Sequence, residues 1–199
     1  MTHSRASRAA LLTALVAAGA LTLSACGDGG TSGGGGDTNF VTGTGGVETV
    51  PKGERRSPEK LAGETLHGEQ LDVADLKGKV VVLNLWGSWC GPCRAEARHF
   101  AAVAEETEAQ GVAFVGINTR DPKKQKAINF EKDYGIEYPS LYDPIGKLIV
   151  NAFPKGTLNP QAIPTTIVLD REGKIAARSL KALDDKGLRK MIDPVIAEK

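Results

Sequence analysis

The most constraining feature of the sequence is a buried-strand pattern that leads into a helix and a second strand. Residues 80–86 (VVVLNLW) are almost all β-branched or aliphatic, which is typical of a strand buried on both faces of a sheet. Residues 112–118 (VAFVGIN) repeat this pattern, and the Ala- and Glu-rich stretch 93–110 predicts a helix that stops at Gly111. Together they predict a βαβ unit of about 40 residues with parallel strands.

The segments on either side extend this unit into an α/β domain. Runs of β-branched residues, turn signals and capping residues indicate the further elements. In chain order, we expect a hairpin over 64–71, the βαβ unit, a helix over 122–134, strands over 165–170 and 175–179, and a helix over 184–197. This order predicts a central mixed β-sheet flanked by helices, with the hairpin as an N-terminal extension.

The N-terminus carries a targeting pattern. Arg5 and Arg8 precede an apolar, Ala-rich run over residues 9–25, and such a basic region before a short apolar region is typical of a secretory signal. With 17 residues the run is at the short limit for a membrane-spanning helix, so an uncleaved anchor helix is the alternative. We expect residues 1–25 to be a signal peptide.

The end of this run, Leu23-Ser24-Ala25-Cys26, resembles the lipobox of bacterial lipoproteins. The resemblance implies that Cys26 is the lipid attachment point and the mature N-terminus. The alternative is a free or disulfide-bonded Cys26, but a lone thiol in a Gly-rich tail is a liability in an oxidising compartment. Acyl chains on Cys26 would hold the protein at the extracytoplasmic face of the cell membrane.

Glycine is concentrated just after Cys26, since ten of the 24 glycines fall between Gly27 and Gly46. A segment of this composition buries too little apolar surface to offset the cost of ordering it. We therefore predict a flexible tether over 26–57 and a folded domain over 58–199, which has an ordinary single-domain size. The net charge of +1 lacks the basic excess of a nucleic-acid-binding protein, so nucleic acid is not an expected partner.

Two cysteines stand where the predicted strand 80–86 gives way to the predicted helix. Cys90 and Cys93 are three positions apart at the start of the helix, so they lie on one face and can close a disulfide. Because a helix N-terminus stabilises negative charge, we expect a lowered thiol pKa for Cys90. We expect the more exposed Cys90 to attack a substrate disulfide and Cys93 to resolve the mixed disulfide. Pro92 suits the first helical turn.

The motif Trp-Cys-Gly-Pro-Cys after an apolar strand, with Ile163-Pro164-Thr165-Thr166 some 70 residues later, resembles the thioredoxin fold. The sequence is more similar to the membrane-anchored extracytoplasmic thiol-disulfide oxidoreductases of the TlpA and ResA type. The resemblance runs from about residue 61 to residue 196 and implies a thioredoxin-like domain over 58–199.

The resemblance also assigns residues to a site. Pro164 matches the cis-proline that faces the Cys pair in this fold, and Ile163 would then offer its backbone to a bound substrate strand. Trp89, Gly91 and Pro92 complete the implied substrate-binding set.

Glu96 matches an acidic residue that this branch uses near the active site. Its carboxylate would exchange a proton with Cys93. The alternative is an exposed charge on the helix surface. Ordinary thioredoxins carry a buried Asp where this chain has Asn84, and because Asn accepts no proton, that role would pass to Glu96 or to water.

These patterns predict an extracytoplasmic, membrane-tethered oxidoreductase that reduces protein disulfides through Cys90 and Cys93. The resemblance implies apocytochrome c as a substrate and a membrane electron donor as a further partner. Dithiol chemistry needs no cofactor.

The alternatives are a copper chaperone-like metal-binding protein or a redox-inert binding module on the same fold. The Cys spacing fits redox use better, and no His lies near Pro164, so we expect no metal site. The extra segment 151–162 is expected either to shape the substrate groove or to be a neutral surface insertion.

Overall fold

The computed structural model describes residues 38–198. The expected signal peptide, the expected lipid attachment point Cys26 and residues 26–37 of the expected tether lie outside the described residues. Between residues 38 and 198, no helix combines the length and the apolar character that crossing a membrane requires.

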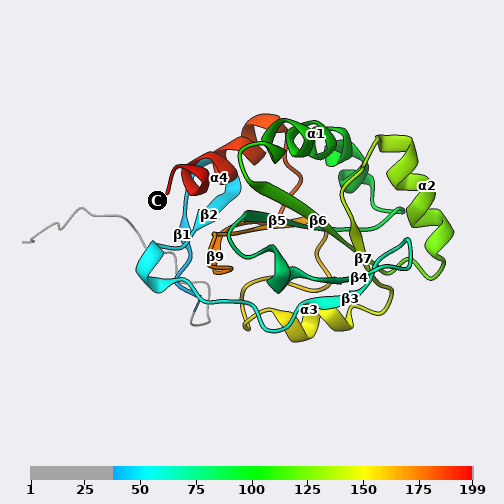
Figure 1. Cartoon of the computed structure of the whole chain (residues 1–199), viewed down its shortest axis with the longest axis horizontal. Coiled ribbons are helices and arrows are strands. Elements are labelled where there is room, and N and C mark those ends of the chain that lie inside the picture. The colour runs from blue at the N-terminus through cyan, green and yellow to red at the C-terminus, as the bar shows by residue number, and fades with distance from the viewer. Residues whose placement is uncertain (1–37, 199) are drawn as a thin grey trace, which may run out of the picture.

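A seven-stranded mixed sheet forms the centre of the molecule, with the strand order β1-β2-β9-β8-β5-β6-β7 (Figure 1). Strands β5, β6 and β7 are parallel to one another, whereas β8 is antiparallel to both β5 and β9. Strands β1 and β2 continue the sheet beyond β9 with antiparallel pairing. The bounds are β1 Val41–Thr42, β2 Val47–Thr49, β5 Val80–Trp86, β6 Val112–Thr119, β7 Ser140–Asp143, β8 Thr165–Leu169 and β9 Ile175–Ser179.

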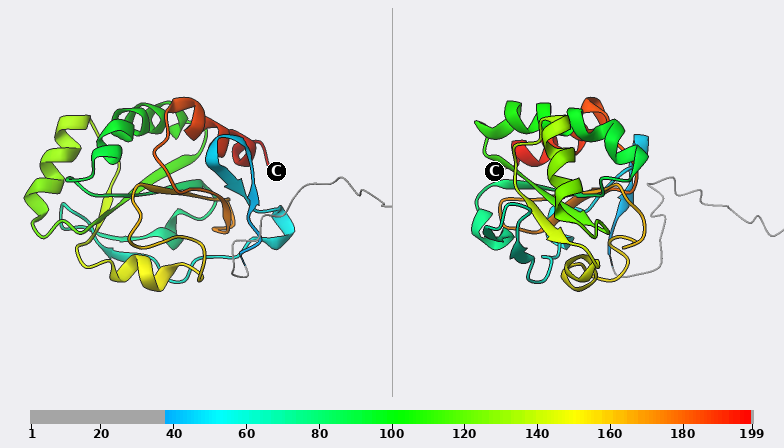
Figure 2. Two further views of the ribbon diagram at one scale, coloured as in Figure 1. Left: turned by 180° about the vertical axis from the view of Figure 1, so that it is seen from behind. Right: turned by 90° about the vertical axis from the view of Figure 1, so that its right-hand side faces the viewer.

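Helices cover both faces of this sheet (Figures 1 and 2). One face carries α1 (Gly91–Glu108), α2 (Lys124–Tyr134) and α4 (Asp185–Ala197). The other face carries α3 (Lys147–Ala152), the hairpin of β3 (Ala62–Glu64) and β4 (Gln70–Asp72), and the short 3-10 helix η3 (Val73–Leu76). Two more 3-10 turns, η1 (Thr44–Gly46) and η2 (Lys52–Glu54), lie in the N-terminal segment. The expected mixed sheet, flanking helices and hairpin extension are therefore present.

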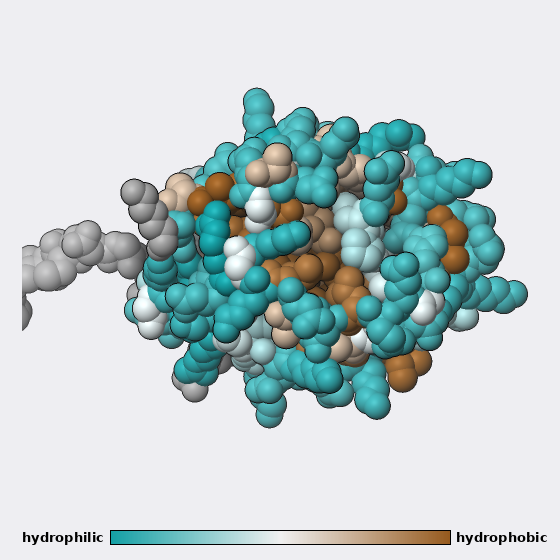
Figure 3. Space-filling model, in the orientation of Figure 1, coloured by the Kyte–Doolittle hydropathy of each residue, from teal (hydrophilic) through white to brown (hydrophobic). Residues whose placement is uncertain are grey.

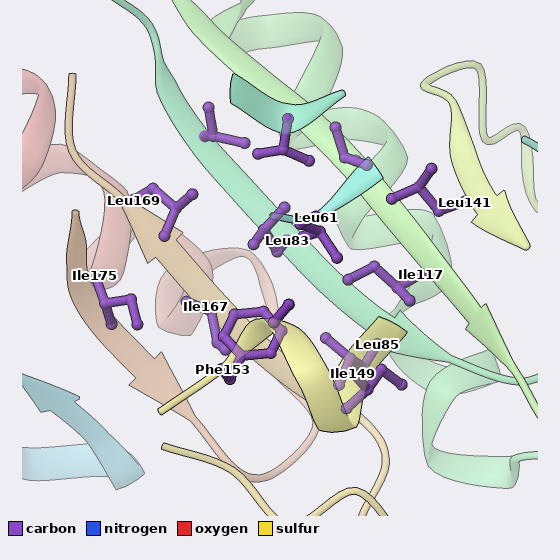
Figure 4. Close-up of a cluster of buried hydrophobic side chains, with 14 of the residues drawn as sticks. Leu61, Leu83, Leu85, Ile117, Leu141, Ile149, Phe153, Ile167, Leu169 and Ile175 are labelled. Atoms are coloured by element: carbon purple, nitrogen blue, oxygen red, sulfur yellow. The ribbon is translucent and has the colours of Figure 1, made fainter. Parts of the chain in front are cut away.

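The central strand β5 explains the unbroken apolar run in the sequence. Alternate side chains point to opposite faces of a strand, and every residue of β5 is buried. Leu83 and Leu85 enter the core beneath α3 (Figure 4), whereas Val80 and Val82 pack in the core beneath α1 and α4. The two cores together fix the direction in which β5 ends, and therefore where the residues after it lie.

The N-terminal segment corrects the predicted tether for residues 38–57. Strand β2 pairs with β9, and Phe40, Val47 and Val50 are buried. The physical reason is that Val47 and Val50, three positions apart, point to opposite faces of the sheet: Val47 packs in the core beneath α1 and α4, and Val50 packs in the core beneath α3. The folded unit thus begins before the expected boundary at residue 58.

Two elements that the sequence analysis did not predict follow α2. Strand β7 has four residues and α3 has six, which is too short for a clear periodic pattern. Part of the segment 151–162 is core rather than a surface insertion, since Ala152, Phe153 and Thr157 are buried. Helix α2 begins at Lys124, two residues after the expected start.

A cavity of about 420 Å³ lies at the end of the sheet where β5 begins and β8 ends. Its apolar wall is formed by Leu61, Val73, Leu76, Val81 and Leu169. Hydrophobic residues also gather near the centre of the face in Figure 3, with hydrophilic side chains around them. Because β5 runs away from this cavity towards Cys90, the cavity is remote from the Cys pair.

Candidate active site

The two predicted redox cysteines form a disulfide at the N-terminus of α1. Cys90 and Cys93 are joined with an S–S distance of 2.07 Å, and both are buried, with Cys90 the more exposed at 4% against 1%. Cys90 is the N-cap of α1, and its Sγ accepts a hydrogen bond of 3.2 Å from the backbone N–H of Cys93. Such a donor at a helix N-terminus stabilises the thiolate form of the reduced pair.

The loop between β5 and α1 is tight because it begins with Gly87. A Cβ at this position would lie 2.9 Å from Trp89 Nε1 and 3.1 Å from the carbonyl oxygen of Thr119, so a larger residue would displace Trp89 or β6. The carbonyl of Gly87 accepts the backbone N–H of Cys90 at 3.0 Å. Pro92 occupies the first helical turn, where no donor is required of it.

The Ile163–Pro164 peptide bond is cis, as the resemblance implied. The carbonyl oxygen of Ile163 lies 3.9 Å from Cys90 Sγ, and the Ile163 side chain packs against the cluster that contains both cysteines. The structure therefore brings Cys90, Cys93, Ile163 and Pro164 together although more than 70 residues separate the two segments.

Trp89 is half exposed beside the disulfide, with 49% of its surface accessible. Its indole Nε1 donates to the carbonyl of Arg120 at 3.1 Å, and the Arg120 guanidinium lies over the indole ring at 4.7 Å. Arg120 also donates to the backbone carbonyl of Gln161 at 3.2 Å. The expected substrate-binding Trp89 is thus held in place by the loop after β6, which is itself linked to the segment before Pro164.

A buried acid that sequence reasoning missed supports the same loop. Asp121 accepts from Ser88 Oγ at 2.6 Å, from the Ser88 backbone N–H at 2.7 Å and from Asn118 Nδ2 at 2.8 Å. Asp121 thereby links the end of β6 to the residue two positions before Cys90. Its place two residues after a buried strand was the available sequence signal, but nothing in the sequence indicates its partner Ser88 in another loop.

Glu96 is buried on the inner face of α1, three residues after Cys93, and only 2% of its surface is accessible. The alternative of a surface charge is therefore wrong. Glu96 Oε1 accepts from Asn84 Nδ2 at 2.8 Å, and Oε2 accepts from the backbone N–H of Leu183 at 3.1 Å. Burial raises the pKa of Glu96 to about 7, although both hydrogen bonds act to lower it. A carboxyl group with this pKa can gain or lose a proton near neutral pH.

The two described histidines pair with carboxylates instead of cysteines. His67 Nε2 lies 3.0 Å from Glu131 Oε2, and His99 Nδ1 lies 2.9 Å from Asp185 Oδ1. Burial raises the pKa of Glu131, an effect that the hydrogen bond with His67 partly opposes. Among residues 38–198, no three His, Cys, Asp or Glu side chains are grouped so that they could hold a metal ion.

Solved structures with clear sequence similarity share this architecture. A DsbF homologue from Corynebacterium diphtheriae is 39% identical with a TM-score of 0.70, and the match covers 78% of this chain and 98% of that one. A secreted thiol-disulfide isomerase from Corynebacterium glutamicum is 33% identical with a TM-score of 0.72, over 82% of this chain and all of that one. The fold is therefore thioredoxin-like.

Among curated proteins, the thiol-disulfide oxidoreductase ResA of Bacillus subtilis is 34% identical over 112 residues, which are 56% of this chain and 59% of that protein. The chain thus matches about three fifths of the length of its ResA relatives. These homologues support a thioredoxin-like oxidoreductase activity. The model of the AhpC/TSA family matches residues 56–178, which include the Cys pair, Glu96 and the cis-proline. The chain belongs to the AhpC/TSA family and resembles its ResA-type thiol-disulfide oxidoreductases.

Proposed function

We propose that the chain is an extracytoplasmic thiol-disulfide oxidoreductase that reduces disulfides in polypeptide substrates. The observation that carries the proposal is the Cys90–Cys93 pair at the N-terminus of α1, opposite the cis Ile163–Pro164 bond. Such an arrangement combines a stabilised thiolate, a resolving thiol one turn inside the helix and a segment against which an extended substrate can lie.

The reaction begins with the reduced pair. The Cys90 thiolate attacks one sulfur of the substrate disulfide, so a mixed disulfide forms and the other substrate sulfur leaves as a thiolate that takes up a proton. The Cys93 thiolate then attacks Cys90 Sγ and releases the second substrate sulfur. Two electrons pass to the substrate, which ends as a dithiol, and the protein ends with the Cys90–Cys93 disulfide. A dithiol reductant must then restore the reduced pair.

Glu96 is the proton-exchanging group in this proposal. Cys93 must lose its proton before it attacks Cys90, and it is buried on the same helix face as Glu96. The pKa of about 7 lets Glu96 accept that proton and later return it. Asn84 cannot take the proton, but its amide holds the Glu96 carboxylate in place.

The wider setting of the reaction is also part of the proposal. A lipid on Cys26 would hold the domain at the extracytoplasmic face of the membrane, where a membrane electron donor would supply the dithiol reductant. Apocytochrome c before haem attachment is the substrate that the resemblance to the TlpA and ResA type implies. The secreted isomerase of Corynebacterium glutamicum supports an extracytoplasmic location.

A trapping experiment tests the proposal. Cys93→Ser removes the resolving thiol, so mixed disulfides with substrates should accumulate on Cys90 and be identified by mass spectrometry after non-reducing electrophoresis. The matched control is Cys90→Ser, which should trap nothing because the attacking thiol is gone. Equal recovery of partners from both variants would contradict the assigned roles, and failure of the purified protein to cycle between dithiol and disulfide would contradict the activity.

A further inference from the structure

Charge is distributed unevenly over the end of the sheet where the disulfide lies. Four segments meet there, after β5 (86–95), after β6 (118–126), after β7 (143–147) and before β8 (158–164). They contain two acidic and six basic residues, an excess of four positive charges in a chain whose net charge is +1. The basic residues are Arg94, Arg120, Lys123, Lys124, Lys126 and Lys147.

The two acidic residues in these segments point into the protein. Asp121 is 1% exposed and binds Ser88 and Asn118, and Asp143 is 3% exposed and accepts the backbone N–H of Ile149 at 3.1 Å. Neither carboxylate forms an ion pair within residues 38–198. Within these four segments, the solvent-facing charges are therefore all positive.

Five of the six basic side chains have no carboxylate partner in the part of the chain that the structure describes. Lys124 pairs with Glu64 of the hairpin, whereas the other five enter no ion pair. We call these five residues the basic rim: Arg94, Arg120, Lys123, Lys126 and Lys147. Elsewhere Arg55, Arg178 and Arg189 each bind a carboxylate, whereas Arg98 and Arg171 donate to backbone carbonyls.

The two arginines of the basic rim hold the loop that carries Cys90. Arg94 donates from Nε and Nη2 to the carbonyl of Ser88 at 3.0 and 2.7 Å. Arg120 stacks on Trp89, and its Nε is buried without a hydrogen-bond partner among the described residues. Both guanidinium groups thus lie beside the two residues that precede Cys90, where a bound substrate must pass.

The opposite side of the disulfide has another charge pattern. The segment 180–185 follows β9, which lies beyond β8, and it contains one basic residue, Lys181, against Asp184 and Asp185. Asp184 caps α4 by accepting the backbone N–H of Gly187, and Asp185 lies against His99. The positive excess therefore lies on the β6 and β7 side of the disulfide.

We propose that the basic rim selects polypeptide substrates with Asp or Glu residues next to the disulfide that is reduced. This inference rests on the proposed function and names its substrate class. The lysines raise the encounter rate of acidic polypeptides through long-range attraction. The arginines, which lack carboxylate partners among residues 38–198, provide planar donors that match a carboxylate at short range.

Matched synthetic peptides test the proposal with the full-length reduced protein. Three peptides share one intramolecular disulfide and differ only in the residues beside it, which are Asp, Asn or Lys. Peptide thiol formation is measured at low and high ionic strength. The Asp peptide should be reduced about tenfold faster than the Lys peptide at low ionic strength, and the ratio should fall with added salt.

Charge variants connect this preference to the basic rim. Lys123 and Lys126 are exposed, so the double change Lys123→Gln and Lys126→Gln should fold normally and lower the Asp-to-Lys rate ratio about threefold. Lys123→Glu with Lys126→Glu should lower it further. The matched control is Lys79→Gln, which removes one positive charge at the start of β5, roughly 20 Å from the loop, and should leave the ratio unchanged.

The outcomes distinguish a failure of the basic rim proposal from a failure of the proposed redox function. Equal rates for the three peptides, or a ratio that the rim variants leave unchanged, would overturn the basic rim while the redox function stands. Failure of the wild-type protein to reduce even the Asn peptide would overturn the proposed function and this inference with it.

Discussion

Charged side chains have different kinds of partners at the two ends of the central sheet. At the end remote from the disulfide, Arg55 is almost buried and lies 3.0 Å from Asp170 and 2.6 Å from Glu198. At the disulfide end, Glu96 is buried with two uncharged donors, and Arg120 lies over an indole ring. The remote end therefore pairs opposite charges, whereas the disulfide end keeps an acid and a cation without ionic partners in the described structure.

The ion pairs at the remote end contribute to stability, whereas the unpaired groups at the disulfide end contribute to reactivity. Hydrogen bonding to Glu198 raises the pKa of Arg55 and lowers that of Glu198, so both groups hold their charge. Glu96 has no such partner, and burial brings its pKa to about 7, where its charge responds to pH. The ion pairs of Arg55 attach the N-terminal segment to the domain. At the disulfide end, Glu96 is available to exchange a proton and, under the proposal, Arg120 is available to bind a substrate.

The largest expected effect on stability concerns the remote end. Arg55→Met leaves buried Asp170 without its cation, so we expect the free energy of unfolding to fall by about 3–4 kcal/mol in urea denaturation. The matched control is Arg189→Met, whose partners Glu106 and Asp193 are exposed, and it should cost less than about 1 kcal/mol. Similar losses in the two variants would contradict the contrast between the ends.

The second prediction concerns the pH dependence that Glu96 causes. Its pKa is raised in the folded state, so its contribution to stability is fully present below about pH 4.5 and is lost as pH rises through about 7. The loss amounts to about 3 kcal/mol. Glu96→Gln should abolish this component, because a rotated Asn84 amide can accept the new NH2 group.

Unfolding of the disulfide form across this pH range measures the effect. The exposed Glu105→Gln serves as a control that should keep the wild-type profile. If Glu96→Gln keeps the same pH profile as Glu105→Gln, the raised pKa of Glu96 is wrong.

The third prediction tests whether the segment that supplies Arg55 belongs to the fold. Val47 is 3% exposed in β2, so Val47→Ala should lower the free energy of unfolding by about 2 kcal/mol. Val41→Ala, in the partly exposed β1, should cost clearly less in the same thermal or urea measurement. No change on Val47→Ala would restore the tether as the sequence predicted it.

The smallest expected effect on stability belongs to the disulfide end. Arg120→Gln removes a cation stacked on an exposed ring, so the free energy of unfolding should fall by less than about 1 kcal/mol. The same variant should lower the preference for the Asp peptide. A large loss of stability would mean that Arg120 supports the fold as Arg55 does, and the comparison between the ends would fail.

Much of the fold was predictable because its centre is local in sequence. The buried strand before Cys90 was predicted at its observed bounds, 80–86, because its burial on both faces leaves a continuous apolar run. The Cys pair is equally local, since the helix that positions it starts within the motif. Pro164 needed the resemblance, because nothing nearby in the sequence links it to the cysteines.

The remainder depended on contacts between distant segments. Glu96 looks like any charged helix residue until Leu183, 87 residues later, donates to it. Strand β2 is too short for a pattern to outweigh the surrounding glycines, and its burial depends on β9. The basic rim has no sequence signature either, because sheet topology alone brings its segments to one edge.

The early start of the folded unit limits how far the active site can travel. Under the proposed anchor at Cys26, only the stretch up to Thr38 separates the lipid from the described chain, and twelve residues span at most about 40 Å when fully extended. A tether that lasted to residue 57 would more than double this radius. The Cys90–Cys93 pair would therefore reach only substrates in a thin layer above the membrane. A protein substrate would have to place its disulfide within that layer.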